Sequence, residues 1–102
     1  MRVIKAFTVQ RWAAQHADAT AGLARWLEMA RKARWKNFAQ LRTACPSADQ
    51  VRVGSGSLVV VFNIAGNAYR LIAAVHFDRQ RIFTLRFLTH AEYSKNRWKN
   101  EL

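Results

Sequence analysis

Residues 58–77, LVVVFNIAGNAYRLIAAVHF, contain two runs of β-branched and aromatic residues on either side of the turn sequence Ala65-Gly66-Asn67. Runs of this kind, bounded by turn residues, predict two antiparallel strands joined as a hairpin. Similar runs stand at 51–53 and 82–88, each set apart by a further turn sequence. The second half of the chain is therefore expected to form an antiparallel sheet built from hairpins.

The first half of the chain follows the helical period instead. Apolar residues recur every three or four positions between residues 19 and 34, which predicts an amphipathic helix with a basic exposed face. Asp18 or Thr20 is expected to cap this helix. Shorter helices are expected at 8–16 and at 38–42, and a short strand at 2–5.

Helices followed by a meander predict an α+β fold, with the N-terminal helices packed on one face of a mainly antiparallel sheet. The chain has 102 residues, of which 51% are hydrophobic. This length and composition predict a single domain, residues 1–102, with a packed core.

The charge balance points to an acidic partner. Seventeen Lys and Arg residues against six Asp and Glu give a net charge of +11. Arg outnumbers Lys, and its planar guanidinium binds phosphate in a bidentate manner, which favours nucleic acid over a membrane surface. A genome rich in G and C would raise the Arg content in the same way.

The sequence also indicates a compartment. It contains no apolar run long enough to span a bilayer and no signal-peptide pattern at residues 1–7. Its one cysteine, Cys45, allows no internal disulfide and fits a reducing environment. A cytoplasmic location without membrane attachment is expected.

Metal and cofactor chemistry is poorly supported by the sequence. The three histidines have no cysteine partners at metal-binding spacing, and few carboxylates lie near them. Gly54-Ser55-Gly56 matches a hairpin turn and does not form a phosphate-binding loop. No metal or cofactor is expected.

Basic and proton-transferring residues gather in the last third of the chain. Arg70 interrupts the half-buried strand at 69–77, Arg86 interrupts the next strand, and His90 and Tyr93 follow at its end. A guanidinium in a central strand is costly unless it meets an anion. Together these residues suggest a metal-free ribonuclease site, in which arginine binds the scissile phosphate and His and Tyr transfer protons during attack by the RNA 2′-oxygen.

A structural explanation of the same residues stays open. Arg70 would then pair with Asp78 or Glu92, and His90 would cap a helix that begins near Thr89. His16 and His76 are given structural roles only.

The catalytic interpretation sets a condition on strand register. Arg70 and Arg86 share a sheet face only if an odd number of residues is inserted between their strands. A two-residue turn at Arg79-Gln80 would place them on opposite faces. A three- or five-residue loop, or a bulge before Leu88, would bring them together.

Further residues are expected to contact RNA without taking part in the chemistry. The helix from 19 to 34 and its extension are expected to present basic side chains to rRNA and mRNA phosphates, although a solvated face is the simpler alternative. Asn63 and Asn67 are candidates for orienting RNA, and Asn67 is also explained as a turn residue with positive φ. The basic candidates are Arg25, Arg31, Lys32, Arg34 and Lys36.

Residues 61–72, VFNIAGNAYRLI, and 86–93, RFLTHAEY, resemble the HigB mRNA interferase family, a branch of the RelE-like toxins. The Asn-x-x-Gly-Asn-x-Tyr-Arg and Thr-His-x-Glu-Tyr motifs occur in order and at suitable spacing. Weaker similarity extends back to the first helix and covers nearly the whole chain.

The resemblance implies a toxin that cleaves mRNA in the ribosomal A site and forms a hetero-oligomer with a HigA-like helix-turn-helix antitoxin. Arg70 matches the phosphate-binding arginine of the wider RelE-like group, and Arg86 and Tyr93 match another arginine and a tyrosine. The strand that carries a pair of catalytic lysines in RelE reads VVVFN at 59–63. No lysine is available there, so proton transfer passes to His90.

Two other functions remain open at this point. The chain could be a non-catalytic RNA- or ribosome-binding module, or a degenerate toxin kept for antitoxin binding. The joint presence of His90, Tyr93 and Arg70 favours the ribonuclease, because a binding module has no need of a proton-transfer pair.

Overall fold

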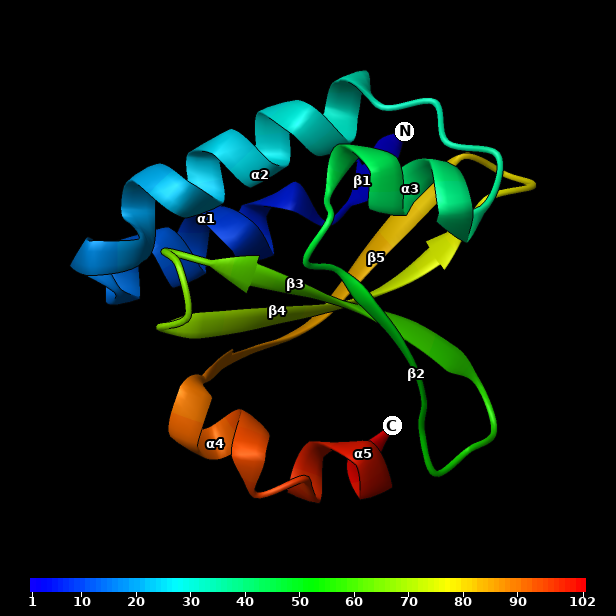
Figure 1. Ribbon diagram of the computed structural model, residues 1–102. Coiled ribbons are helices and arrows are strands. Elements are labelled where there is room, and N and C mark those ends of the chain that lie inside the picture. Colours follow the sequence, from blue (N-terminus) through cyan, green and yellow to red (C-terminus); the bar gives the residue numbers. More distant parts are fainter.

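A five-stranded sheet forms the centre of the computed structural model, which describes residues 1–102 (Figure 1). The strand order is β1-β5-β4-β3-β2, with β1 parallel to β5 and all other neighbours antiparallel. The predicted α+β class and the mainly antiparallel sheet are confirmed. The strands are β1 (Arg2–Ile4), β2 (Asp49–Arg52), β3 (Leu58–Ile64), β4 (Tyr69–His76) and β5 (Arg81–Thr89).

Helices cover both faces of this sheet. The two longest, α1 and α2, lie together on one face, as predicted, while α4 and α5 lie against the other (Figure 1). None of the helices is both long enough and apolar enough to cross a membrane. The helices are α1 (Ala6–Gln15), α2 (Thr20–Lys32), α3 (Phe38–Ala44), α4 (His90–Ser94) and α5 (Arg97–Glu101), with a 3-10 turn at Ala17–Ala19 before α2.

The residues of β3 and β4 are buried alternately in two hydrophobic clusters. Phe62 and Leu71 belong to the larger cluster beneath α1 and α2. Val61 and Ile72 belong to a smaller cluster that is closed by Trp98 of α5. Ile72 is fully buried, so the face of β4 that carries Arg70 and His76 is apolar at its centre. The sequence pattern did not indicate this second layer.

The start of α2 differs from the expectation. Ala19 is its N-cap residue, and no side chain caps the helix. The Thr20 hydroxyl donates instead to the Ala13 carbonyl at 2.7 Å, and the Asp18 carboxylate accepts from the Tyr69 hydroxyl at 2.8 Å. The predicted cap is therefore wrong, because both polar side chains bind partners outside α2.

Candidate active site

The register between β4 and β5 decides whether the two candidate arginines share a face. Residues 77–80 connect the strands, and Ala73 pairs with Thr84. Beyond that pair Ile72 is opposite Arg86, so Leu85 is an extra residue in β5. This bulge moves the pairing by one position and brings Arg70, which lies opposite Leu88, onto the same face as Arg86. The bulge before Leu88 was one of the arrangements that the sequence required.

Arg70 lies at the centre of the candidate site. Its Nη1 donates to the carbonyl oxygens of Asn67 at 3.1 Å and of Tyr69 at 3.2 Å. Its guanidinium carbon lies 5.5 Å from the centre of the Tyr93 ring, in a cation–π arrangement. Most of its N–H groups therefore remain without a protein partner and can bind an anion.

No carboxylate neutralises Arg70. The one ion pair in the structure joins Lys32 to Glu28 at 2.9 Å, so Arg70 pairs with neither Asp78 nor Glu92. The proposed ion pairs are wrong, and no carboxylate forms a salt bridge with the half-buried Arg70.

Asparagine side chains lie beside Arg70. Asn63 is directly opposite Arg70 in β3. Its Nδ2 donates to Oδ1 of Asn67 at 3.4 Å, across the turn between β3 and β4. The structure thus brings Asn63, Asn67, Arg70 and Tyr93 together at one end of the sheet. Positive φ is found at Ala65 and Gly66 in this turn, which contradicts the explanation of Asn67 as a positive-φ residue.

Tyr93 is held on α4 by its neighbours. Its ring stacks on Trp98 at 5.4 Å with an interplanar angle of 19°, and the Trp98 indole donates to the Tyr93 carbonyl at 3.1 Å. The Tyr93 hydroxyl has no hydrogen bond to protein, so it is free to act on a ligand. Position 93 was expected from the sequence, but its support by Trp98 was not.

His90 is the first residue of α4 and is exposed. Its backbone N–H donates to the Ala68 carbonyl at 3.0 Å, which fixes the start of α4 against the β3–β4 turn. The helix is capped by a reciprocal pair of bonds between Thr89 and Glu92. The alternative role of His90 as the cap is therefore wrong, and its imidazole makes no hydrogen bond to protein.

Arg86 lies on the same face as Arg70, two residue pairs further from the end of the sheet. It is half-buried, and its Nη1 donates to the Leu85 carbonyl at 2.9 Å. This bond belongs to the bulge, so the irregularity that places Arg86 on this face also helps to orient its guanidinium.

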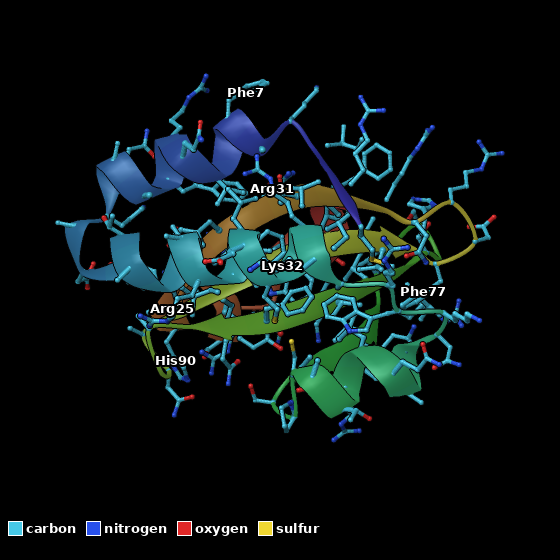
Figure 2. The ribbon with its side chains drawn as sticks, turned by 90° about the horizontal axis from the view of Figure 1, so that it is seen from above. Phe7, Arg25, Arg31, Lys32, Phe77 and His90 are labelled. Carbon is cyan, nitrogen blue, oxygen red and sulfur yellow. The ribbon has the colours of Figure 1, made fainter.

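The predicted RNA-binding cations divide into two groups. Arg31, Lys32 and Arg34 line a pocket of about 540 Å³ together with Met1, Arg2 and Gln80. Arg25 lines a different pocket, beside the β3–β4 turn, and Figure 2 shows it apart from Arg31 and Lys32. Arg34 and Lys36 follow the end of α2 at Lys32, so their predicted helical position is wrong. The chain beyond Lys32 is extended at Ala33.

A second cluster near the same end of the sheet was missed by the sequence reasoning. The His16 ring lies edge-on to Tyr69 at 5.2 Å and to Phe87 at 5.3 Å. The hydrogen bond to Asp18, together with burial, raises the pKa of Tyr69. These residues belong to distant parts of the chain, and nothing in their local sequence indicates the contact.

A family model described as the RelE-like toxic component of a toxin–antitoxin system matches residues 19–96. The α+β fold agrees with this class of toxin. The chain belongs to the HigB toxin family within it. A search of curated proteins finds no significant match. The matched residues include Arg70, Arg86, His90 and Tyr93, whereas α5 with Trp98 lies beyond them.

Proposed function

We propose that this toxin is a ribosome-dependent endoribonuclease that cleaves mRNA by metal-independent attack of the 2′-hydroxyl. The main observation in support is that the Arg70 guanidinium forms no salt bridge with a carboxylate and lies 5.5 Å from the centre of the Tyr93 ring. A cation without a counter-ion, next to a free phenol, suits a site that binds phosphate and transfers protons.

The proposed reaction forms one bond and breaks one. The 2′-oxygen loses its proton and attacks phosphorus, the bond from phosphorus to the 5′-oxygen breaks, and that oxygen leaves with a proton. The products are a 2′,3′-cyclic phosphate and a 5′-hydroxyl. Arg70 binds the scissile phosphate and stabilises its developing negative charge, and Arg86 adds a second cation from the same face. His90 and Tyr93 supply the groups that accept and donate the two protons.

The remaining candidates act in binding. Asn63 and Asn67 orient the RNA next to Arg70 through their amide groups. Arg25, Arg31, Lys32, Arg34 and Lys36 contact rRNA or mRNA phosphates, with Lys32 shared between RNA and Glu28.

The toxin is proposed to act in the cytoplasm, where ribosomes are found, and to be neutralised by a HigA-like helix-turn-helix antitoxin in a hetero-oligomer. Membership of a toxin–antitoxin family supports an antitoxin partner. Copurification with the product of an adjacent gene for a small helix-turn-helix protein, with loss of toxicity, tests this partner.

A non-catalytic RNA-binding module and a degenerate toxin are the alternatives. The free Tyr93 hydroxyl and the free His90 imidazole favour the enzyme, because binding alone requires only the arginines. Expression of the chain alone, with primer extension on cellular mRNAs, distinguishes the three. Growth arrest with in-frame cleavages supports the enzyme, growth arrest without cleavage supports the binding module, and normal growth supports the degenerate toxin.

The chemistry is tested with purified toxin and programmed ribosomes. Cleavage should persist in excess EDTA, once the ribosomes are stabilised with polyamine, and should stop when the nucleotide at the cleaved position is 2′-deoxy. Equal cleavage of the 2′-deoxy substrate, or equal cleavage of free mRNA without ribosomes, would contradict the proposal.

A further inference from the structure

The face of the sheet that carries Arg70 and Arg86 is only partly covered by helices. Under α5 this face forms the smaller hydrophobic cluster. Ile82 belongs to the larger cluster on the opposite face, so Phe83 beside it and its partner Ala74 lie on the face of Arg70. Phe83 and Ala74 belong to neither cluster, and Figure 1 shows the β4–β5 hairpin extending away from α4 and α5. No helix therefore covers the sheet around Phe83.

Phe83 has one aromatic and two basic neighbours on this face. Arg81, two positions earlier in β5, pairs with His76 of β4 and with Arg2 of β1. The His76 ring lies edge-on to Phe83, with 5.2 Å between the ring centres and an interplanar angle of 78°. Phe83 is partly exposed and the other three residues are exposed. These four residues, Arg2, His76, Arg81 and Phe83, are called the Phe83 strip.

The positive charges of the Phe83 strip are not neutralised by the protein. Arg2 and Arg81 are directly opposite each other, and like charges in that position are unfavourable in a sheet. The one ion pair in the structure joins Lys32 to Glu28 in α2. The only strand residue with a carboxylate, Asp49, is in β2, two strands away from β4. An anion beside Arg2 and Arg81 would relieve their repulsion.

The Phe83 strip continues the candidate active site along β4 and β5. Ile72 is opposite Arg86 and Ala74 is opposite Phe83, so Phe83 lies two residue pairs beyond Arg86. This separation is about 7 Å along the strands at roughly 3.3 Å per residue. Arg70 lies two residue pairs from Arg86 in the other direction. An RNA strand bound at Arg70 and Arg86 can therefore reach Phe83 on the same face of the sheet.

We propose that the Phe83 strip binds a nucleotide of the mRNA adjacent to the cleaved phosphodiester. The base packs against the rings of Phe83 and His76, and its phosphate is bound by Arg81 and Arg2. Aromatic rings combined with cations are the usual means of binding single-stranded nucleic acid. The inference rests on the proposed function and extends the site from the cleaved bond to a neighbouring nucleotide. The uncovered apolar side chains are few, and the cations around them favour RNA over a protein partner.

Ribosomes programmed with an mRNA that is 2′-deoxy at the cleaved position allow binding to be measured without cleavage. We expect Phe83→Leu to lower the affinity of the full-length toxin for these ribosomes about tenfold, through loss of one base–aromatic contact. Affinity for ribosomes without mRNA should stay unchanged. Phe83→Tyr keeps the ring and should keep the parent affinity. Phe7→Leu is the matched control, because Phe7 is exposed and lies beside Arg11 in α1, which covers the other face.

The phosphate contact is tested by removing one charge. Arg81→Gln should lower the affinity for programmed ribosomes and reduce the salt dependence of binding by about one phosphate contact. Arg79→Gln is the control for net charge, because Arg79 is exposed in the loop of the same hairpin. Equal effects of the two variants would contradict a phosphate site at Arg81.

A photo-crosslink identifies the bound RNA directly. 5-Iodouridine forms crosslinks to aromatic side chains on irradiation, and it is placed in turn at each mRNA position next to the cleaved nucleotide. The toxin is irradiated with this mRNA on ribosomes and with the same mRNA free in solution, and the adducts are mapped by mass spectrometry. We expect one position to give adducts at Phe83 or His76.

The outcomes separate this inference from the proposed function. If no position gives an adduct at Phe83 or His76 with either form of the mRNA, the inference is wrong, whatever the toxin cleaves. Equal loss of affinity by Phe83→Leu with and without mRNA would assign the strip to rRNA, and loss of antitoxin binding alone would assign it to a protein interface. Either result would overturn the proposal. Adducts at Phe83 without cleavage of unmodified mRNA would keep the strip and remove the proposed enzyme activity.

Discussion

The guanidinium of Arg70 lies over the ring of Tyr93, with 5.5 Å between the guanidinium carbon and the ring centre. Trp98 stacks on the same ring. The ring therefore contributes to stability, while the hydroxyl makes no bond to protein. These two parts of one side chain can be separated by substitution, which gives the first test of the site.

Tyr93→Phe keeps the ring and removes the hydroxyl. Single-turnover cleavage of ribosome-bound mRNA should slow by about 10²-fold if the hydroxyl transfers a proton or orients the phosphate. The melting temperature should stay unchanged, because Arg70 and Trp98 retain the ring. Tyr93→Ala serves as the contrast and should lower both activity and stability. Parent-rate cleavage by the Phe variant would remove the hydroxyl from the mechanism.

His90→Gln should abolish toxicity and mRNA cleavage while leaving thermal stability and antitoxin binding unchanged. The reason is that the cap of α4 is made by Thr89 and Glu92, so the imidazole has no structural bond to lose. Thr89→Ala is the matched control and should lower stability by about 1 kcal/mol through loss of the cap. A Gln variant that cleaves at the parent rate would leave catalysis to the arginines alone.

Arg70→Ala should lower the cleavage rate by about 10²- to 10³-fold, as expected when one donor to a developing charge is removed. Stability should fall by only about 0.5–1 kcal/mol, since the cation–π contact with Tyr93 is lost but no ion pair is. Arg70→Lys keeps the charge without the planar fork and should recover only part of the activity. Full activity in the Lys variant would show that the charge suffices and that bidentate binding is not used.

Ribosome binding should weaken steeply as salt rises, because cation–phosphate contacts release counterions. Reversing two charges of the basic pocket, Arg31→Glu with Arg34→Glu, should lower affinity measured by sedimentation without changing the rate of cleavage at saturation. Arg42→Glu with Arg79→Glu is the charge-matched control, because both residues are exposed and neither lines this pocket. If the control weakens binding equally, the effect comes from net charge and not from the pocket.

The cap of α4 predicts a pH dependence of stability. The backbone N–H of Thr89 donates to the Glu92 carboxylate and holds the pKa of Glu92 below its ordinary value of 4.5. The ionised form is thus favoured in the folded state, so its contribution is present above pH 4.5 and is lost as the pH falls through the folded-state pKa. Melting curves of the parent and Glu92→Gln should differ at neutral pH and converge in acid. A difference that persists in acid would assign the effect to the amide substitution itself.

Local sequence patterns were sufficient to predict the sheet and the long helices. The runs at 58–64 and 82–88 are β-branched or aromatic and bounded by turn residues, so residue type and turn positions both predict strands. The same patterns placed Arg70, Arg86, His90 and Tyr93 near one another in the chain. Their shared face depended on register, and the residue that sets it, Leu85, looks like any other apolar residue in its strand.

Contacts between distant segments of the chain could not be predicted from local sequence patterns. The bond from Tyr69 to Asp18 spans 51 positions and shows no local signal. The sequence RWKNE of α5 is almost wholly polar, so Trp98 did not suggest a helix that covers a sheet. The pocket between α2 and the end of β3 likewise depends on where β2 begins, and strand ends are the least determined feature of a sequence pattern.

The short helix α5 touches the fold at two separated places. Trp98 seals the smaller core and bonds to Tyr93, while the Lys99 carbonyl accepts from Gly54 N–H at 2.7 Å in the β2–β3 turn. Substitutions in α5 are therefore expected to reduce the proposed activity indirectly, by disturbing Tyr93 and the smaller core. A genetic screen for loss of toxicity should return Trp98 together with His90 and Arg70. Only a measurement of folding will distinguish the Trp98 variants, which destabilise the fold, from the His90 and Arg70 variants, which leave it intact.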